Sequence, residues 1–331
     1  MKSKISKSLL FTLAVIIIAY CLPIVITNKY YTNLMIQVLI NIVVVVGLNF
    51  ITGLTGQMNL GTAGIFGLGS YTSALLVTKL GISPWMGLIG AIVMGMLIGL
   101  CLGYPSLRLK GVYLALTTIG FTEIVRILLT NLTDFTGGPK GISKIPQFSI
   151  FGFVFNNNKS VYYLYLTFTV ILLALATRII KSKWGRAFKA IKDNPDAMGT
   201  LGINISKMKI IAFTLATVYG CIGGSMYAHF FKYINPSTLT MDFSINYVIM
   251  MIIGGVGSVP GSILGSILVT ITPELLRFLQ SYYWLIFSII TLLFVVFLPN
   301  GIVSIFDGRS WSNKLNIGKK GGKKNGDDIK N

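Results

Sequence analysis

Long apolar runs alternate with short polar pieces along most of the chain. A helix needs about 20 predominantly apolar residues to cross a bilayer, so runs near this length are candidate spans. The uninterrupted candidates cover residues 9–26, 34–51, 60–79, 84–104, 111–130, 161–179 and 210–231. This pattern predicts an all-α fold, a polytopic bundle of transmembrane helices.

The apolar stretch at residues 245–298 is too long for one span and contains a run of glycines. Its centre reads GGVGSVPG at residues 254–261, and glycine and proline interrupt helices in such a place. We therefore expect two short spans beside the break, followed by a span at 283–298. The chain then crosses the membrane about ten times. Eight crossings is the alternative, with broken segments that re-enter the membrane instead of crossing it.

A second glycine-rich break, GLTGQMNLG at residues 53–61, separates two earlier apolar runs. Transporters often contain paired, glycine-interrupted segments in corresponding halves of the chain, with the substrate pathway between them. The two breaks share a loose glycine spacing, which raises an internal repeat as a hypothesis. Our candidates for the translocation pathway or for helix pairing at the breaks are Gly56, Gln57, Asn59, Gly61, Gly254, Gly255 and Gly257.

The composition agrees with a chain surrounded by lipid. Hydrophobic residues make up 53% of the sequence and charged residues 11%, whereas a soluble domain has about 25% charged residues. The net charge of +19 arises from Lys and Arg in the polar pieces and at the termini, a pattern typical of membrane topology and not of nucleic-acid binding. Cys21, Cys101 and Cys221 lie in apolar runs at spacings that match no metal motif.

The sequence lacks catalytic and nucleotide-binding patterns. Its single histidine, His229, ends an apolar run, and we expect it at the membrane interface. A Gly-x-x-x-x-Gly-Lys-Ser/Thr loop for phosphate binding is absent. We expect no enzyme activity, no metal and no cofactor in this chain, so uphill transport needs energy from a partner or from an ion gradient.

The positions of Lys and Arg predict the orientation of the chain, because these residues collect in cytoplasmic loops. Cations are dense in the N-terminal residues, in 106–110, in 178–209 and in the tail after Asp307. We place all four regions on the cytoplasmic side, which requires an even number of spans. The expected parts are a transmembrane permease domain at 1–307 and a basic, disordered cytoplasmic tail at 308–331.

A long polar segment, residues 181–208, lies between two predicted spans. Phe188 and Ile191 share one face of a predicted helix near its start. Pro195 favours the first turn of a second short helix, and Gly202 fits the position just past its end. We expect a pair of short helices on the cytoplasmic surface, with an apolar edge available to a partner protein. The alternative is a solvated basic loop.

Glu123 and Arg126 lie inside the predicted span 111–130, three residues apart and on one helix face. Charges are costly in hydrocarbon and usually face the bundle interior or a partner charge. The two residues either line the pathway or form a structural ion pair that pins this helix to a neighbour. The sequence leaves both interpretations open.

The predicted external segment, residues 131–160, contains a compact glycine-rich turn. We expect Gly137, Gly138 and Pro139 to form part of an external gate and of the surface where a binding protein docks. A plain surface loop is the alternative.

Four motifs in the same order and spacing resemble the LivM-type permeases of branched-chain amino acid importers. They are SLRLKGVYLA at 106–115, TGGPKGI at 136–142, GRAFKAI at 185–191 with Ala197 and LGI at 201–203, and GGVGSVPG at 254–261. The chain departs from the family where it reads PDAMGT at 195–200 and NLGT at 59–62. These departures leave the transport role intact and bear on the exact cargo.

In ATP-binding-cassette importers the loop that contains the GRAFKAI-like motif carries a coupling helix, which seats in a groove of the ATPase. The resemblance therefore assigns a set of loop residues to ATPase coupling. They are Gly185, Arg186, Phe188, Lys189, Ile191, Ala197 and Gly202.

The resemblance implies a multi-pass permease subunit in the bacterial cell membrane, with leucine, isoleucine or valine as cargo. It also implies a homologous second permease chain, two ATPase subunits that bind ATP and Mg²⁺, and an external substrate-binding protein. Whether the permease pair is a homodimer or a heterodimer stays open. The exact cargo stays open too, because related permeases carry urea or short amides.

An ion-coupled secondary transporter is the alternative from a different class. Such transporters usually place several acids in their membrane core. In this chain only Glu123 lies deep in a predicted span, which favours coupling to a separate ATPase.

The predicted orientation can be tested with single cysteines on a background that lacks Cys21, Cys101 and Cys221. We expect cysteines in the N-terminal residues, in 184–209 and in the tail to be protected from an impermeant thiol reagent in intact cells, because all three regions are cytoplasmic. Labelling of any of them from outside would overturn this topology.

Overall fold

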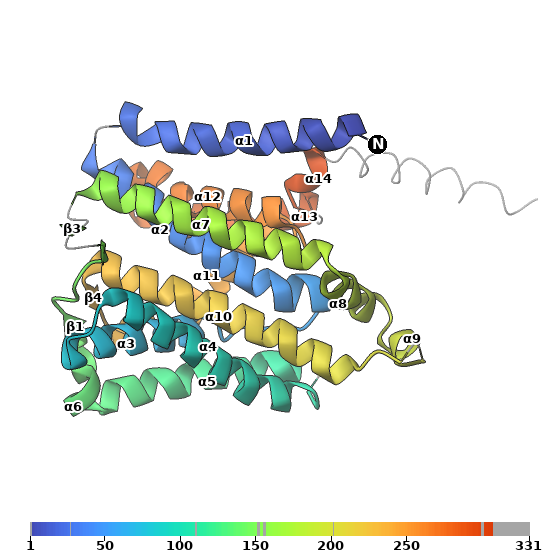
Figure 1. The fold of residues 1–331 in the computed structure, drawn as a ribbon, viewed down its shortest axis with the longest axis horizontal. Coiled ribbons are helices and arrows are strands. Elements are labelled where there is room, and N and C mark those ends of the chain that lie inside the picture. The colour runs from blue at the N-terminus through green and yellow to red at the C-terminus, as the bar shows by residue number, and fades with distance from the viewer. Residues whose placement is uncertain are drawn as a thin grey trace, which may run out of the picture.

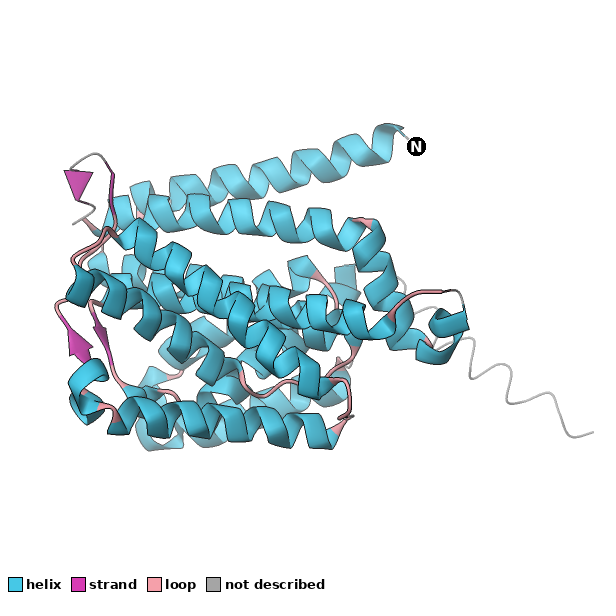
Figure 2. Ribbon diagram, turned by 60° about the horizontal axis from the view of Figure 1, so that its bottom comes forward, coloured by secondary structure: helices cyan, strands magenta, loops and turns pink. Residues whose placement is uncertain are grey.

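The computed structural model describes residues 2–26, 28–109, 111–150, 153–154, 157–200, 202–298 and 301–306. Long helices lie side by side along one direction, and small strands gather at one end of the bundle (Figures 1 and 2). The predicted tail at 308–331 lies outside the described residues.

The long helices occupy the residue ranges expected from the apolar runs. They are α1 (Lys2–Val25), α2 (Lys29–Leu48), α3 (Thr62–Leu80), α4 (Pro84–Ser106), α5 (Val112–Asn131), α7 (Asn158–Lys181), α10 (Ile205–Phe231), α11 (Met241–Gly254), α12 (Val259–Leu275) and α13 (Tyr283–Phe297). The all-α prediction is thereby confirmed for the described part of the chain.

The remaining elements are short. The short helices are α6 (Thr133–Thr136), α8 (Lys183–Asp193), α9 (Pro195–Thr200) and α14 (Val303–Phe306), and 3₁₀ turns cover Gly138–Lys140, Pro236–Thr238 and Arg277–Tyr282. Strand β1 (Ile142–Ser143) pairs antiparallel with β4 (Tyr233–Ile234), and β2 (Ser149–Ile150) pairs with β3 (Phe153–Val154).

Among the described residues, five helices are long and apolar enough to cross a membrane. They are Lys29–Leu54, Pro84–Ser106, Val112–Asn131, Asn158–Lys181 and Ile205–Phe231. Shorter apolar helices cover Ala14–Val25, Met241–Gly254, Val259–Leu275 and Leu285–Phe294. The chain is thus an integral membrane helix bundle, and the number of crossings and their orientation stay predictions.

Helix α10 lies at the centre and packs against α2, α3 and α4. Glycines allow this close approach. A side chain at Gly99 would place its Cβ 2.5 Å from the Cα of Thr214, and one at Gly95 would meet the Cα of Val218 at 2.8 Å. Small residues at helix contacts are how membrane helices gain packing energy, because lipid supplies no hydrophobic drive between them.

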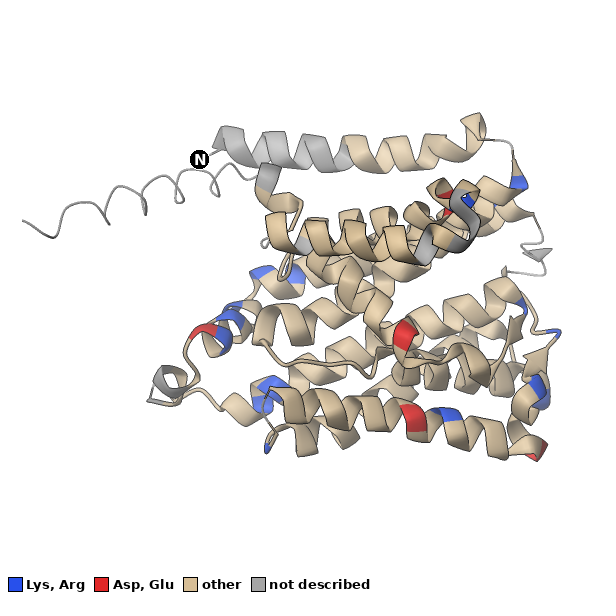
Figure 3. Cartoon of the chain, turned by 180° about the vertical axis from the view of Figure 1, so that it is seen from behind, with Lys and Arg blue, Asp and Glu red and all other residues tan. Residues whose placement is uncertain are grey.

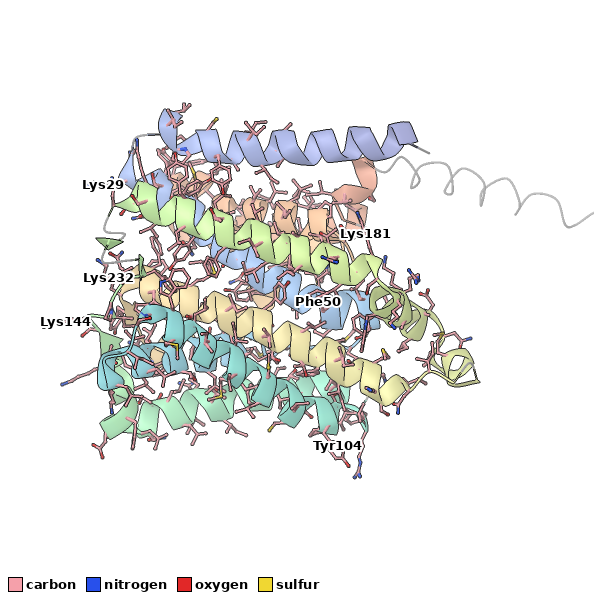
Figure 4. The ribbon with its side chains drawn as sticks, viewed as in Figure 1. Lys29, Phe50, Tyr104, Lys144, Lys181 and Lys232 are labelled. Atoms are coloured by element: carbon pink, nitrogen blue, oxygen red, sulfur yellow. The ribbon has the colours of Figure 1, made fainter. Side chains whose placement is uncertain are left out.

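The two ends of the bundle differ. Helices α8 and α9 lie at one end, the α8 end, and strands β1 and β4 lie at the other, the strand end (Figure 1). Lys29, Lys144 and Lys232 lie at the strand end, whereas Lys181 and Tyr104 lie at the α8 end (Figure 4). Lys and Arg therefore gather at both ends, with a long, almost uncharged section between them (Figure 3).

The expected break in the last apolar stretch is present, since α11 ends at Gly254 and α12 begins at Val259. Gly255 and Gly257 have φ angles of 128° and 85°, in the region that favours glycine. The earlier break has a feature that the sequence did not predict. Helix α2 continues into a π-helix at Asn49–Leu54 before the chain leaves helical structure, and π-helical turns occur often at functional sites.

Candidate functional site

Helix α8 follows directly after α7 and packs against α7, α10 and the π-helix Asn49–Leu54. The Ser182 side chain caps its start by accepting a hydrogen bond from the Trp184 N–H at 3.1 Å. Gly185 then lies so close to the backbone of Ile180 that a side chain would collide with it. These two residues fix the sharp turn between the helices.

The two faces of α8 have opposite surroundings. Phe188 and Ile191 are 0% and 3% exposed, and Phe188 belongs to the core of the chain itself. The expectation that this apolar edge is available to a partner is therefore wrong, because the bundle already covers it. The outward face carries Arg186 and Lys189, both exposed, and Trp184 is exposed at the start of the helix, one turn before Phe188.

Helix α9 agrees with the sequence prediction in its backbone. It begins at Pro195, and Gly202 has a φ angle of 75°, a left-handed conformation that suits glycine past a helix end. The Gly202 N–H donates to the Gly199 carbonyl at 3.1 Å. Ala197 lies in the same helix, and its side chain is outside the described part of the chain.

The two glycine-rich breaks meet at a set of contacts that we call the break junction. Its centre is the buried amide of Asn49, which donates to the Ser258 carbonyl at 3.0 Å and to the Ser262 Oγ at 3.1 Å. The Asn49 Oδ1 accepts the Gly257 N–H at 2.8 Å. A Cβ on Gly53 would lie 2.8 Å from the Gly257 N, so the two backbones touch.

Helix α8 reaches the break junction through Lys192. The Lys192 Nζ donates to the Gly53 carbonyl at 3.0 Å. The side-chain stem passes over Gly56, where an added Cβ would lie 3.2 Å from the Lys192 Cγ. Gly56 has a φ angle of 70°. Glycine therefore allows the left-handed turn and also leaves room for the Lys192 side chain.

The rest of the first break lies against α5. Gln57 and Asn59 are buried, 7% and 2% exposed, and the Asn59 Oδ1 accepts the Gly61 N–H at 2.8 Å. The Leu60 N–H donates to the Thr118 Oγ at 3.0 Å. A side chain at Gly61 would meet the Thr118 carbonyl oxygen at 2.9 Å. The break thus connects α8, the second break and α5.

Glu123 and Arg126 form the ion pair that their spacing predicts, with the Arg126 Nε donating to the Glu123 Oε2 at 3.0 Å. The pair lies midway along α5 (Figure 3). Their side chains are 50% and 36% exposed, and the partner of each is on the same helix. The interpretation that the pair pins α5 to a neighbouring helix of this chain is therefore wrong.

The outer faces of α4 and α5 differ in a way that matters in lipid. The outer face of α4 is apolar, with exposed Met86, Ile89, Val93, Met96, Leu97 and Leu100. The outer face of α5 is apolar too, with exposed Leu116, Ile124, Ile127 and Leu128, but it also carries the ion pair. Gly120 on that face has open space where a side chain would be. The α4 face suits hydrocarbon throughout, whereas the charged position on α5 needs protein or water beside it.

The glycine-rich turn lies at the strand end and is as compact as expected. Gly137 and Gly138 have φ angles of 75° and 58°, and the Thr136 Oγ donates to the Leu129 carbonyl at 2.6 Å. Pro139 follows in a 3₁₀ turn. The chain then enters β1, which pairs with β4 directly after α10.

His229 was expected at the membrane interface, which stays a prediction; it lies in the last turn of α10, and its side chain is 1% exposed. Its Nδ1 lies 2.6 Å from the Pro146 carbonyl oxygen, and its Nε2 lies 2.9 Å from the Ser73 Oγ. The histidine thereby connects α10 to α3 and to the loop after β1. Its position at the end of an apolar run did not reveal this role.

Metal ligands are not clustered in the described part of the chain, where no group of three or more His, Cys, Asp or Glu side chains could hold an ion. Cys21, Cys101 and Cys221 are free.

Comparison with known proteins identifies transport proteins as relatives. The family model for the permease component of branched-chain amino acid transport systems matches residues 30–296. The high-affinity branched-chain amino acid transport system permease protein LivM of Salmonella typhimurium is 32% identical over 320 residues, which cover 90% of this chain and 75% of that protein. No solved structure matches the chain.

Two further relatives broaden the comparison. The high-affinity branched-chain amino acid transport system permease protein LivH of Escherichia coli is 25% identical, covering 78% of this chain and 90% of that protein. The guanosine ABC transporter permease protein NupQ of Bacillus subtilis is 27% identical, covering 57% of this chain and 61% of that protein. These relatives are transport subunits and not enzymes. The chain belongs to the family of permease components of branched-chain amino acid transport systems.

Proposed function

We propose that this chain is the membrane-spanning permease subunit of an ATP-binding-cassette importer for leucine, isoleucine and valine in a bacterial cell membrane. The observation that carries the proposal is the similarity to LivM over 90% of the chain. The shorter similarity to a guanosine permease makes a nucleoside a competing cargo, and urea and short amides remain competitors within the family.

The α8 end faces the cytoplasm in this proposal, and both termini lie on that side. ATP and Mg²⁺ are held by two ATPase subunits. Since Phe188 and Ile191 anchor α8 on the permease, the ATPase contacts the outward face formed by Arg186 and Lys189, together with the exposed Trp184 at the start of the helix. An aromatic side chain and an arginine are the residue types that contribute most at protein interfaces.

The translocation pathway runs along the outer face of α5, between this chain and a homologous second permease chain. An ion pair that faced lipid midway along a helix would be costly, so the exposed Glu123–Arg126 pair needs protein or water beside it. The open position at Gly120 allows close approach of another helix. At the strand end, Gly137, Gly138 and Pro139 form part of the external gate, where the binding protein docks.

The cargo is tested by uptake in cells that lack their own branched-chain importer and express this chain with its ATPases, second permease and binding protein. We expect labelled leucine to enter in an ATP-dependent manner and to be displaced by excess isoleucine or valine. Excess guanosine or urea should leave the rate unchanged. Leucine uptake that guanosine abolishes, or ATP-dependent uptake of guanosine or urea without leucine uptake, would refute the assignment of cargo.

The α5 pathway is tested by Glu123→Gln, Arg126→Gln, and the reversed pair Glu123→Arg with Arg126→Glu. Removing one charge leaves the other unpaired, which should lower the amount of folded protein, and the reversed pair should restore that amount. Because charges in a pathway act by their position, we expect uptake to stay at least about tenfold below wild type in all three variants. Abundance by immunoblot and uptake are measured together. Full uptake in the reversed pair would show a structural ion pair only.

A further inference from the structure

Helix α8 has two kinds of attachment to the rest of the chain. The first is apolar, through the buried Phe188 and Ile191. The second is polar, from the Lys192 Nζ to the Gly53 carbonyl at 3.0 Å. The apolar attachment holds the helix on the bundle, whereas the polar contact connects it to one specific peptide group.

That peptide group lies at the end of a broken helix. The last carbonyls of a helix lack partners within the helix and carry its partial negative charge. Gly53 belongs to the π-helix Asn49–Leu54 that ends α2. The Lys192 ammonium therefore supplies both a donor and a positive charge to an end that would otherwise be under-bonded. A hydrogen bond from a charged donor is stronger than a neutral one.

The same short segment is bonded on its other side to the second break. Asn49 bonds Gly257, Ser258 and Ser262 at 2.8–3.1 Å, and Gly53 touches Gly257. A displacement of Lys192 would therefore act on the end of α2 and, through Asn49, on the start of α12. Four helices, α2, α3, α11 and α12, end or begin at these two breaks.

We propose that Lys192 is a positioning residue of the transport cycle, which passes the movement of the coupling helix α8 to the junction of the two glycine-broken segments. The proposal rests on the function proposed above. In it the outward face of α8 receives the force from the ATPase, and Lys192 delivers that force to the helices beside the pathway. Gly56 keeps the space through which the lysine stem passes.

The test uses the complete transporter in proteoliposomes, with its ATPases, second permease and binding protein. The measured quantity is the coupling ratio, the number of leucine molecules taken up per ATP hydrolysed. The variants are Lys192→Met, which removes the donor, and Lys192→Arg, which keeps a cationic donor. The control is Lys183→Met, which removes the same charge from the exposed start of the same helix.

We expect Lys192→Met to retain ATP hydrolysis and to lower the coupling ratio about tenfold, the effect of losing one charged hydrogen bond. Lys192→Arg should retain most of the ratio. Lys183→Met should leave the ratio unchanged, because Lys183 belongs neither to the proposed ATPase contact nor to the break junction. Because uptake and ATP hydrolysis are measured on the same complexes, their ratio does not fall when less complex is present.

A wild-type ratio in Lys192→Met would overturn the proposal, and so would an equal fall in Lys183→Met. A reduced amount of complex with a normal ratio would overturn it too, since Lys192 would then only stabilise the fold. The proposed function fails separately, if the wild-type complex hydrolyses ATP without importing a branched-chain amino acid.

Discussion

A single buried amide, that of Asn49, holds together the two places where the membrane helices are interrupted. An interrupted helix leaves backbone groups without partners, and each such group costs several kcal/mol, about 2–7, in an environment without water. Asn49 serves the Gly257 N–H and the Ser258 carbonyl, and Lys192 serves the Gly53 carbonyl. The backbone groups of the two breaks thus find partners in the side chains of Asn49 and Lys192.

This arrangement joins parts of the chain that have different tasks. The first break contacts α5 through the Thr118 side chain, and α5 carries the exposed ion pair. The same break contacts α8 through Lys192. The first break is therefore the place in the described structure where α8, the second break and α5 meet.

The sequence predicted the helices and the breaks well, because both depend on local composition. Apolar length decides where a span begins and ends, and the glycines at 254–257 interrupt a helix whatever surrounds them. The partners of the breaks were not predictable, since Asn49 and Ser258 are 209 residues apart and meet only in the folded bundle. Asn49 lies in an apolar run, and such a polar residue is the signal that could have pointed to the break junction.

One site prediction failed, and one choice between two interpretations could not be made from the sequence, for a shared reason. Periodicity identified the apolar face of α8, with Phe188 and Ile191. It could not decide whether the helix bundle of the same chain or a partner protein covers that face. Spacing identified the Glu123–Arg126 pair, but it could not decide which way the pair faces. Both outcomes depend on how neighbouring helices pack, and no pattern within one helix contains that information.

The central claim is that Asn49 orders the second break, and hydrogen exchange of the protein in lipid nanodiscs tests it directly. In Asn49→Leu we expect the Gly257 amide to exchange about tenfold faster, because it loses its acceptor, while amides of α10 stay unchanged. Asn41→Leu is the control. Asn41 lies earlier in α2 and bonds Thr270 and Tyr247, so its replacement should leave Gly257 protected. Unchanged exchange at Gly257 in Asn49→Leu would contradict the account.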